Sequence, residues 1–265
     1  MSNTTATSPR RVERMGRLAA IGLLAGLAVA PGHASASPQE PKAMQPTTAQ
    51  TSETLSPRQQ AIVPIAAFAA AGDIARLGPA LNQGLDAGLT VGDAREVLVQ
   101  VYAYAGFPRS LNALGELLKV LEARRQRGLQ DAPGSAPSRP IPQGDALLAA
   151  GTANQTRLVG APVKGPLFDF APAIDQYLKT HLFGDIFERD NLDWQSREIA
   201  TVGMLSALAG AESQLQSHMG ISMNVGLTPG QLRQLAQVLA DRVDGAHAAR
   251  ADGALVRALA ARGGK

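Results

Sequence analysis

His218 is the side chain of this sequence best suited to acid–base chemistry, because an imidazole takes up and releases protons near neutral pH. Glu198 precedes it by 20 residues and, if it lies nearby in the fold, would hold the ring in one tautomer. Such a pair could move a proton onto or off a carbon next to a carboxylate or carbonyl group. The alternatives are a buried histidine that donates to a backbone carbonyl, and a capping or salt-bridging role for Glu198.

Other catalytic chemistries lack their residues. The chain contains no cysteine, which excludes disulfides, zinc–thiolate sites and thiol peroxidase chemistry. His181, His218 and His247 show no metal-binding spacing, so no metal site is expected. There is no Gly-x-Ser-x-Gly elbow, and aromatic residues make up only 4% of the chain, which argues against base stacking on single-stranded nucleic acid.

Two arginines and two aromatic residues could shape a substrate site around the acid–base pair. Arg109 and Arg197 could each bind a substrate carboxylate through a bidentate fork, although arginines at such positions are more often solvated or ion-paired. Tyr104 and Phe107 are expected mainly in the core, with pocket lining as the alternative.

The first 36 residues have the layout of a secretory signal peptide. A segment with four arginines precedes an apolar run over 18–30, which is too short to span a bilayer, and Ala34-Ser35-Ala36 offers a cleavage site. A membrane anchor or a disordered tail is the alternative. We expect a periplasmic or secreted protein. The general secretory route is favoured over the twin-arginine route, because Glu13 stands where the latter signal usually has an apolar residue.

Cleavage after Ala36 would also change the charge of the chain. The formal charge is +3, and the removed segment holds four arginines and one glutamate, so the mature chain would be neutral. The basic isoelectric point is therefore poor evidence for a nucleic-acid partner. We expect no nucleic-acid partner and no stable membrane insertion after cleavage.

Two segments rich in Pro, Ser, Thr or Gly divide the remaining chain. Residues 37–54 are interpreted as a flexible lead-in and residues 127–142 as a linker. Elsewhere Ala and Leu are frequent and β-branched alternation is scarce, which predicts an all-α fold. Residues 98–105 and 114–121 place apolar side chains at i, i+3, i+4 and i+7, as in a helix that buries one face.

An internal repeat organises these helices. Two stretches of equal length, 55–125 and 192–262, match with an offset of 137 residues that rises to 138, so one residue is inserted. The match is anchored by Ile62 with Ile199 and by Gly88-Leu89-Thr90 with Gly226-Leu227-Thr228. In each tripeptide the glycine suits the end of one helix and the threonine suits the cap of the next.

Each copy is therefore predicted to form four helices. The fourth should run from about 108 to 125 in the first copy and from about 245 to 262 in the second. Two further helices, at about 143–158 and 171–183, should precede the second copy. Because units of this size bury little surface alone, we expect the two copies to pack on each other and to offer an oligomer interface.

Several strings resemble the carboxymuconolactone decarboxylase family, which includes the alkyl hydroperoxidase D group. In the first copy they are Gly88-Leu89-Thr90, Arg95-Glu96-Val97-Leu98, Tyr104-Ala105-Gly106-Phe107-Pro108-Arg109 and Asn112. In the second copy they are Leu182-Phe183-Gly184-Asp185-Ile186-Phe187, Arg189, Leu192, Arg197-Glu198, Gln214-Leu215-Gln216-Ser217-His218 and Gly226-Leu227-Thr228. The resemblance implies an all-α fold of two tandem helical bundles packed together, in a family that commonly assembles into rings such as trimers or hexamers. For this chain we expect a homo-oligomer, either a trimer or a dimer.

One departure from the family concerns its thiols. In the hydroperoxidase branch a Cys-x-x-Cys pair lies seven and four residues before a histidine. Ala211 and Gln214 occupy those positions ahead of His218. Without a thiolate nucleophile, thiol-based peroxide reduction is excluded.

The resemblance also implies where a site would lie. The second copy keeps the polar pair of the family, Glu198 and His218, where the first copy has Ala61 and about Ala80. These complementary losses predict one composite site, with acid–base groups from the second copy and a pocket wall from the first, unless a neighbouring chain supplies the wall. The implied substrate-binding residues are Arg109, Arg197, Tyr104, Phe107, Pro108 and Asn112.

Two functions remain open. The first is a cofactor-free enzyme that decarboxylates or isomerises a small carboxylated molecule, such as a lactone. The second is a non-enzymatic oligomeric binding or scaffold protein whose site has decayed. A pocket holding His218, Glu198 and an arginine would favour the enzyme, and a pocket filled by side chains would favour the scaffold. The predicted divisions are 1–36 signal peptide, 37–54 lead-in, 55–126 first repeat, 127–142 linker, and 143–262 second repeat with two preceding helices.

Overall fold

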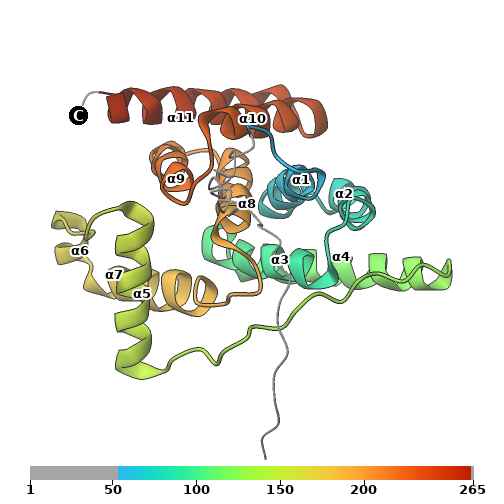
Figure 1. The fold of residues 1–265 in the computed structure, drawn as a ribbon, viewed down its shortest axis with the longest axis horizontal. Helices are drawn as coiled ribbons and strands as arrows, with labels where there is room; N and C mark the ends of the chain where they lie inside the picture. The colour runs from blue at the N-terminus through green and yellow to red at the C-terminus, as the bar shows by residue number, and fades with distance from the viewer. Residues whose placement is uncertain (1–52, 264–265) are drawn as a thin grey trace, which may run out of the picture. The chain divides into compact units, whose positions relative to one another are not determined.

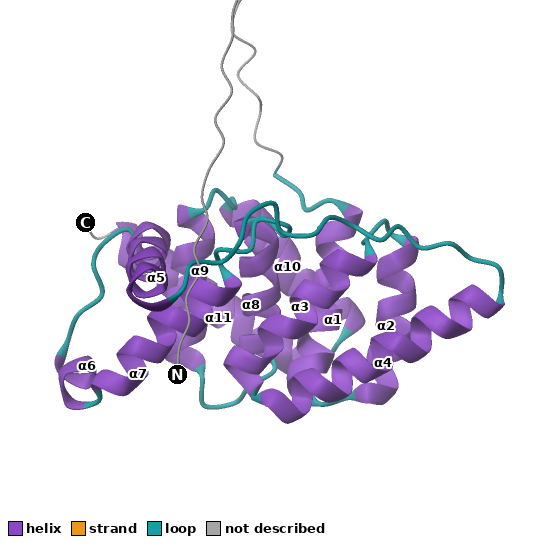
Figure 2. Cartoon of the chain, turned by 90° about the horizontal axis from the view of Figure 1, so that it is seen from below, coloured by secondary structure: helices purple, strands orange, loops and turns teal. Residues whose placement is uncertain are grey.

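A computed structural model describes residues 53–263, which belong to one compact unit, Ala49–Lys265. The predicted signal peptide and nearly all of the predicted lead-in lie outside the described residues. Within 53–263 every regular element is a helix and no strand occurs, which confirms the all-α prediction (Figures 1 and 2). None of these helices is both long and apolar enough to cross a bilayer.

The helices fall into a first set, a connecting group and a second set. The first set is α1 (Pro57–Ala71), α2 (Ile74–Asp86), α3 (Val91–Ala105) and α4 (Phe107–Gln126). The connecting group is α5 (Gly144–Val159), α6 (Pro166–Phe170), α7 (Pro172–Tyr177) and the π-helix η1 (Leu178–Ile186). The second set is α8 (Trp194–Ser206), α9 (Glu212–Asn224), α10 (Pro229–Arg242) and α11 (Gly245–Gly263).

The internal repeat is visible in the helix boundaries. The first residues of α1 and α8 differ by 137 positions, whereas the first residues of the next three pairs of helices differ by 138. The single inserted residue therefore falls between α8 and α9. Each set has four helices in the same order, as the repeat in the sequence predicts.

Local capping explains why the third helix of each repeat begins where it does. Thr90 and Thr228 each accept a hydrogen bond from the backbone N–H three residues later, at 3.0 and 3.1 Å, and each forms a capping box. Gly88 and Gly226 precede them with φ of 92° and 98°, a left-handed conformation that glycine adopts without strain.

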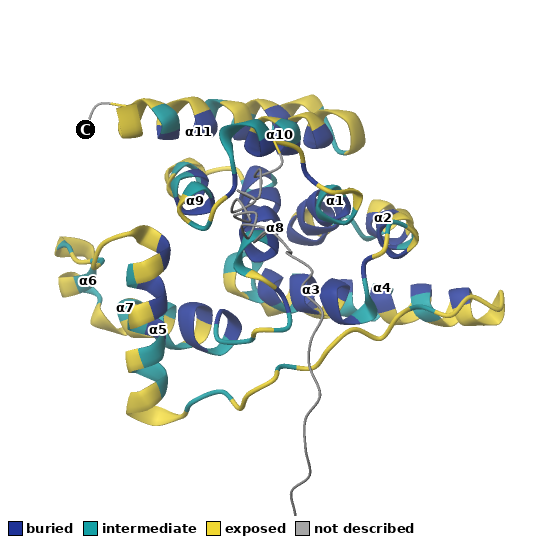
Figure 3. Cartoon of the chain, viewed as in Figure 1, coloured by how far each residue is buried: buried dark blue, intermediate teal, exposed yellow. Residues whose placement is uncertain are grey.

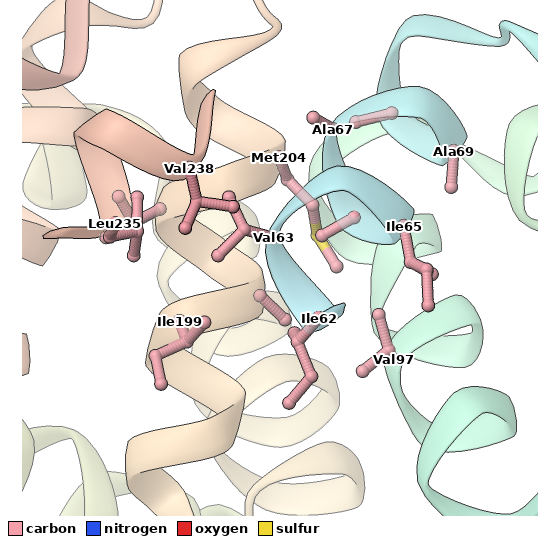
Figure 4. Packing of buried hydrophobic residues seen from close by; sticks show 14 of the residues in the cluster. Ile62, Val63, Ile65, Ala67, Ala69, Val97, Ile199, Met204, Leu235 and Val238 are labelled. Atoms are coloured by element: carbon pink, nitrogen blue, oxygen red, sulfur yellow. The ribbon is translucent and has the colours of Figure 1, made fainter. Parts of the chain in front are cut away.

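The two central helices, α1 and α8, pack against each other at the centre of the core. Both are buried along nearly their whole length (Figure 3), and the buried residues of α8 include Arg197 and Glu198 beside its apolar and small side chains. At Gly203 of α8 an added Cβ would lie only 3.0 Å from the Val63 carbonyl of α1, so the helices approach at backbone distance. Ile62 and Ile65 of α1 extend the same core toward Val97 of α3 (Figure 4).

Each central helix also contacts the third helix of the other repeat. Helix α1 packs on α10, and α8 packs on α3. In Figure 4, Val63 of α1 lies near Leu235 and Val238 of α10. The hydrophobic core is thus shared between the repeats, which confirms that the tandem bundles pack together.

The connecting group differs from the sequence prediction in one helix. Helix α5 matches the helix expected at 143–158, but the helix expected at 171–183 is divided into the short α7 and the wider η1. The reason lies in its packing on α5: an added Cβ at Gly184 would lie 2.7 Å from the Leu147 side chain, and one at Gly151 of α5 would collide with the Lys179 carbonyl of η1. Helix α5 and η1 form a pair that packs on α9 and α3.

Candidate active site

Helices α8 and α9 bring Glu198 and His218 together. Glu198 is the fifth residue of α8, and His218 is the seventh residue of α9. The two helices pack side by side, and Nδ1 of His218 lies 2.8 Å from Oε2 of Glu198. In the first repeat the same helix positions hold Ala61 of α1 and Ala80 of α2, so the pair occurs once among the described residues.

The geometry of the pair defines the tautomer of the histidine. A carboxylate oxygen can only accept from Nδ1–H, so in the neutral ring the lone pair is on Nε2. Glu198 is fully buried and His218 is 8% exposed. Within residues 53–263, Nε2 has no hydrogen-bond partner, and it is the nitrogen left to exchange a proton with a ligand.

Tyr104 of α3 brings the first repeat to the pair. Its ring meets the His218 ring edge-on, with centroids 5.7 Å apart and an interplanar angle of 77°. The hydroxyl lies 3.3 Å from Oγ1 of Thr201 on α8. Burial, and then the negative charge of Glu198, raise the pKa of Tyr104, so the phenol stays protonated. The arrangement combines both repeats, because the His218 ring of the second repeat contacts an aromatic ring of the first.

A cavity of about 550 Å³ opens at His218. Its wall is mostly apolar, and the side chains that line it include no aspartate, glutamate, lysine or arginine. The lining residues are Ala103, Tyr104, Gln155, Leu167, Phe168, Ile174, Leu178, Leu182, Phe183, Leu205, Leu208, Ala211, Ser213, Gln214, Ser217 and His218. A mostly apolar cavity with a few polar groups is typical of a small-molecule site.

The two predicted arginine ligands do not line this cavity. Arg197 is fully buried, and its Nη2 atom bonds Oε2 of Glu96 at 3.1 Å and the Arg189 carbonyl at 2.9 Å. Arg197 precedes Glu198 by one residue, so its side chain leaves the helix about 100° away from that of Glu198. Arg109 donates to the Ala70 carbonyl at the end of α1. Both guanidinium groups therefore bind other parts of the protein in this structure.

Three further predicted substrate ligands also lie outside the cavity. Phe107 is 63% exposed and stacks on the Tyr102 ring at 4.5 Å between centroids, while Pro108 and Asn112 are exposed on the first turns of α4. Gly106 separates α3 from α4 with φ of 85°, and the chain turns there. Of the predicted pocket wall, only Tyr104 lines the cavity.

Sequence reasoning missed the opposite wall of the cavity. That wall comes from the connecting group, with Gln155 on α5, Phe168 on α6 and Leu182 on η1. Nothing in the sequence marked Gln155 and Phe168, because they lie outside the matched repeats and carry no recognisable motif. Leu182 belongs to a string that resembles the family, but that string did not indicate a place in the cavity wall. Over residues 53–263 no group of three or more His, Asp or Glu side chains is arranged to hold a metal ion.

The fold and the site place the chain in a known family. A profile of the carboxymuconolactone decarboxylase family matches residues 38–119 and 172–257, more than half of the chain. The chain belongs to this family, in a form with two tandem copies. Helix α5 lies outside both matched ranges. A search of curated proteins found no match.

Proposed function

We propose that the protein catalyses cofactor-free proton transfer at a carbon atom next to a carbonyl group of a small molecule. The buried His218–Glu198 pair at the wall of a mostly apolar cavity is the observation that carries this proposal. Decarboxylation and lactone isomerisation, the two reactions that the family resemblance suggests, both need such a step.

In this mechanism Nε2 of His218 removes a proton from the carbon next to the carbonyl, leaving an enolate. Glu198 accepts from Nδ1–H throughout and stabilises the imidazolium that forms. The imidazolium then returns the proton to another carbon of the conjugated system. The Tyr104 ring packs against the imidazole and limits its rotation.

The alternative is a binding protein whose catalytic site has decayed. Support for it comes from the absence of an arginine among the lining residues, since Arg109 and Arg197 bind other parts of the protein. The cavity is open rather than filled by side chains, and its one ionisable pair is well aligned, which favours the enzyme.

Solvent exchange tests the proposal directly. The purified protein is incubated in D₂O with α-angelica lactone, a β,γ-unsaturated γ-lactone, and NMR follows deuterium at the carbon next to the carbonyl and formation of the conjugated isomer. His218→Gln should slow both by about 10²-fold or more, the usual contribution of a general base. Glu198→Gln should also slow them. His247→Gln, on α11 and outside the cavity lining, is the matched control. Equal rates in His218→Gln and the control would leave the binding-protein alternative.

Export and self-association are part of the same proposal. The arginine-rich segment and apolar run ahead of Ala34-Ser35-Ala36 support export to the periplasm or the exterior. Exposed apolar side chains along α4, Phe107, Leu111 and Leu118, support a homo-oligomer. Analytical ultracentrifugation of the mature chain tests assembly, and the N-terminal sequence of the exported protein tests cleavage.

A further inference from the structure

Gln155 lines the cavity with a side-chain amide that has no protein partner. The residue is 4% exposed and lies on α5. Among residues 53–263, neither its Oε1 nor its Nε2 atom makes a hydrogen bond to another protein group. Neither atom is fully enclosed, so the amide reaches open space and is available to a molecule in the cavity.

Its neighbours hold the amide in place. One turn earlier, an added Cβ at Gly151 would lie 1.7 Å from the Lys179 carbonyl, so α5 and η1 meet backbone to backbone. Asn154, the adjacent residue, donates through Nδ2 to the Phe183 carbonyl at 2.9 Å and to Oε1 of Glu188 at 2.6 Å. These contacts fix the position and rotation of α5, and with them the point on the cavity wall from which the Gln155 side chain extends.

The charges around the cavity disfavour an anionic ligand. No lysine or arginine is among the lining residues, so a bound carboxylate would lose its hydration without an ammonium or guanidinium partner. The Glu198 carboxylate behind His218 would also repel it. A second hollow shares Gln155 and Phe168 with the cavity and contains Lys164 and Lys179, of which Lys179 pairs with Asp175. Lys164 is therefore the side chain in that hollow that could bind a carboxylate in competition with the cavity.

We propose that Gln155 is a substrate-binding residue whose Nε2 donates to the carbonyl oxygen of an uncharged, mostly apolar lactone or ketone. The inference rests on the proposed function only in placing the reacting carbon at His218. In the reaction a proton moves from the carbon next to the carbonyl to the γ-carbon, and the double bond shifts from β,γ to α,β. Gln155 stabilises the enolate oxygen between the two steps. An uncharged substrate has no carboxylate to lose, so the reaction is isomerisation rather than decarboxylation.

Because α5 lies outside both family-matched ranges, specificity would come from a segment that the family profile does not include. The acid–base pair and its tyrosine belong to the repeats, whereas the amide that selects the carbonyl belongs to the connecting group. Substrate choice could then change without altering the chemical step.

A matched ester and acid test the charge of the ligand. The probes are a butenolide bearing an acetic acid side chain and its methyl ester, with a ¹³C label in the ring carbonyl. Calorimetry measures binding of each to wild type, Gln155→Leu, Lys164→Ala and the control Gln237→Leu, whose exposed amide bonds Asp241 on α10. Infrared difference spectra report whether the labelled carbonyl accepts a hydrogen bond.

We expect the ester to bind wild type and the control at least tenfold more tightly than the acid, with the carbonyl band shifted to lower frequency. Gln155→Leu should weaken ester binding about tenfold and abolish the shift, while its circular dichroism and melting temperature remain those of a folded protein. A carbonyl band that still shifts in Gln155→Leu would overturn the proposal. Acid binding as tight as ester binding would also overturn it. If that acid binding were then lost in Lys164→Ala, the carboxylate would lie in the neighbouring hollow. Ester binding with the band shift but without deuterium exchange would support Gln155 and contradict only the proposed proton transfer.

Discussion

Replacing Glu96 with glutamine should destabilise the fold by about 3 kcal/mol at pH 7. Glu96 of α3 is 1% exposed and accepts from Arg189 at 2.7 and 2.9 Å, from Asn191 at 3.1 Å and from Arg197 at 3.1 Å. Burial opposes its ionisation, but the hydrogen bonds from Arg189 and Asn191 and the charge of Arg197 outweigh burial and lower its pKa from 4.5 to about 2. At about 1.4 kcal/mol per pH unit, that fall corresponds to about 3 kcal/mol.

A second argument gives the same magnitude. Removing one partner of a buried ion pair costs about 3–5 kcal/mol, because the other charge remains without compensation. Arg197 is fully buried and would be that charge. Since Arg197 precedes Glu198, the loss would also loosen the start of α8, which carries the glutamate of the acid–base pair.

The effect has a defined pH dependence. Because the pKa of Glu96 is lower in the folded protein, its contribution is complete above about pH 4.5 and is lost as the pH falls toward about 2. Wild type and Glu96→Gln should therefore differ most near neutral pH and converge in acid.

Urea unfolding followed by far-UV circular dichroism at several pH values measures this difference. Glu122→Gln is the control, because Glu122 forms an exposed pair with Arg125 on α4 and should leave the unfolding free energy unchanged. A Glu96→Gln variant within about 1 kcal/mol of wild type at pH 7 would refute the reasoning. A gap that stays constant down to pH 2 would show that the loss is steric rather than ionic.

Three further predictions concern single side chains. Gly151→Ala should lower the free energy of unfolding by about 1–3 kcal/mol in thermal unfolding, since the new methyl group in its ideal position would collide with the Lys179 carbonyl oxygen. Thr228→Ala should cost about 1 kcal/mol in urea unfolding because α10 loses its N-cap. Tyr104→Phe should show the same rise in phenolate absorbance at 295 nm as wild type between about pH 9 and 11, because burial and Glu198 raise the Tyr104 pKa above that range. A smaller rise in the variant would show that Tyr104 ionises in this range and would contradict the burial argument.

Much of the fold could be predicted because its signals are local. The two Gly-Leu-Thr tripeptides mark helix ends through backbone conformation and capping, which depend on a few adjacent residues. The equal spacing of the repeats follows from them, and the helix starts reproduce the one-residue insertion. Division of the expected helix at 171–183 was not predictable, because η1 arises from close packing against α5 rather than from its own composition.

The site was predictable only where helix position sets the contact. Glu198 and His218 meet because adjacent helices carry them at facing positions. The partner of Arg197 could not be read from the sequence, since Glu96 lies 101 residues away and the contact depends on how α3 packs on α8. The same holds for Gln155, whose amide is functional in our proposal only because no neighbour uses it.

The packing of α1 on α8 has an evolutionary consequence. If two identical chains met through these helices, symmetry would require every site to appear twice, and each mutation would alter both sites at once. Joining the copies in one chain removes that constraint. One half can then carry Ala61 and Ala80 and serve as a structural support, while the other half carries Glu198 and His218. A fused pair of repeats can thus be asymmetric, with one His218–Glu198 pair for its two halves.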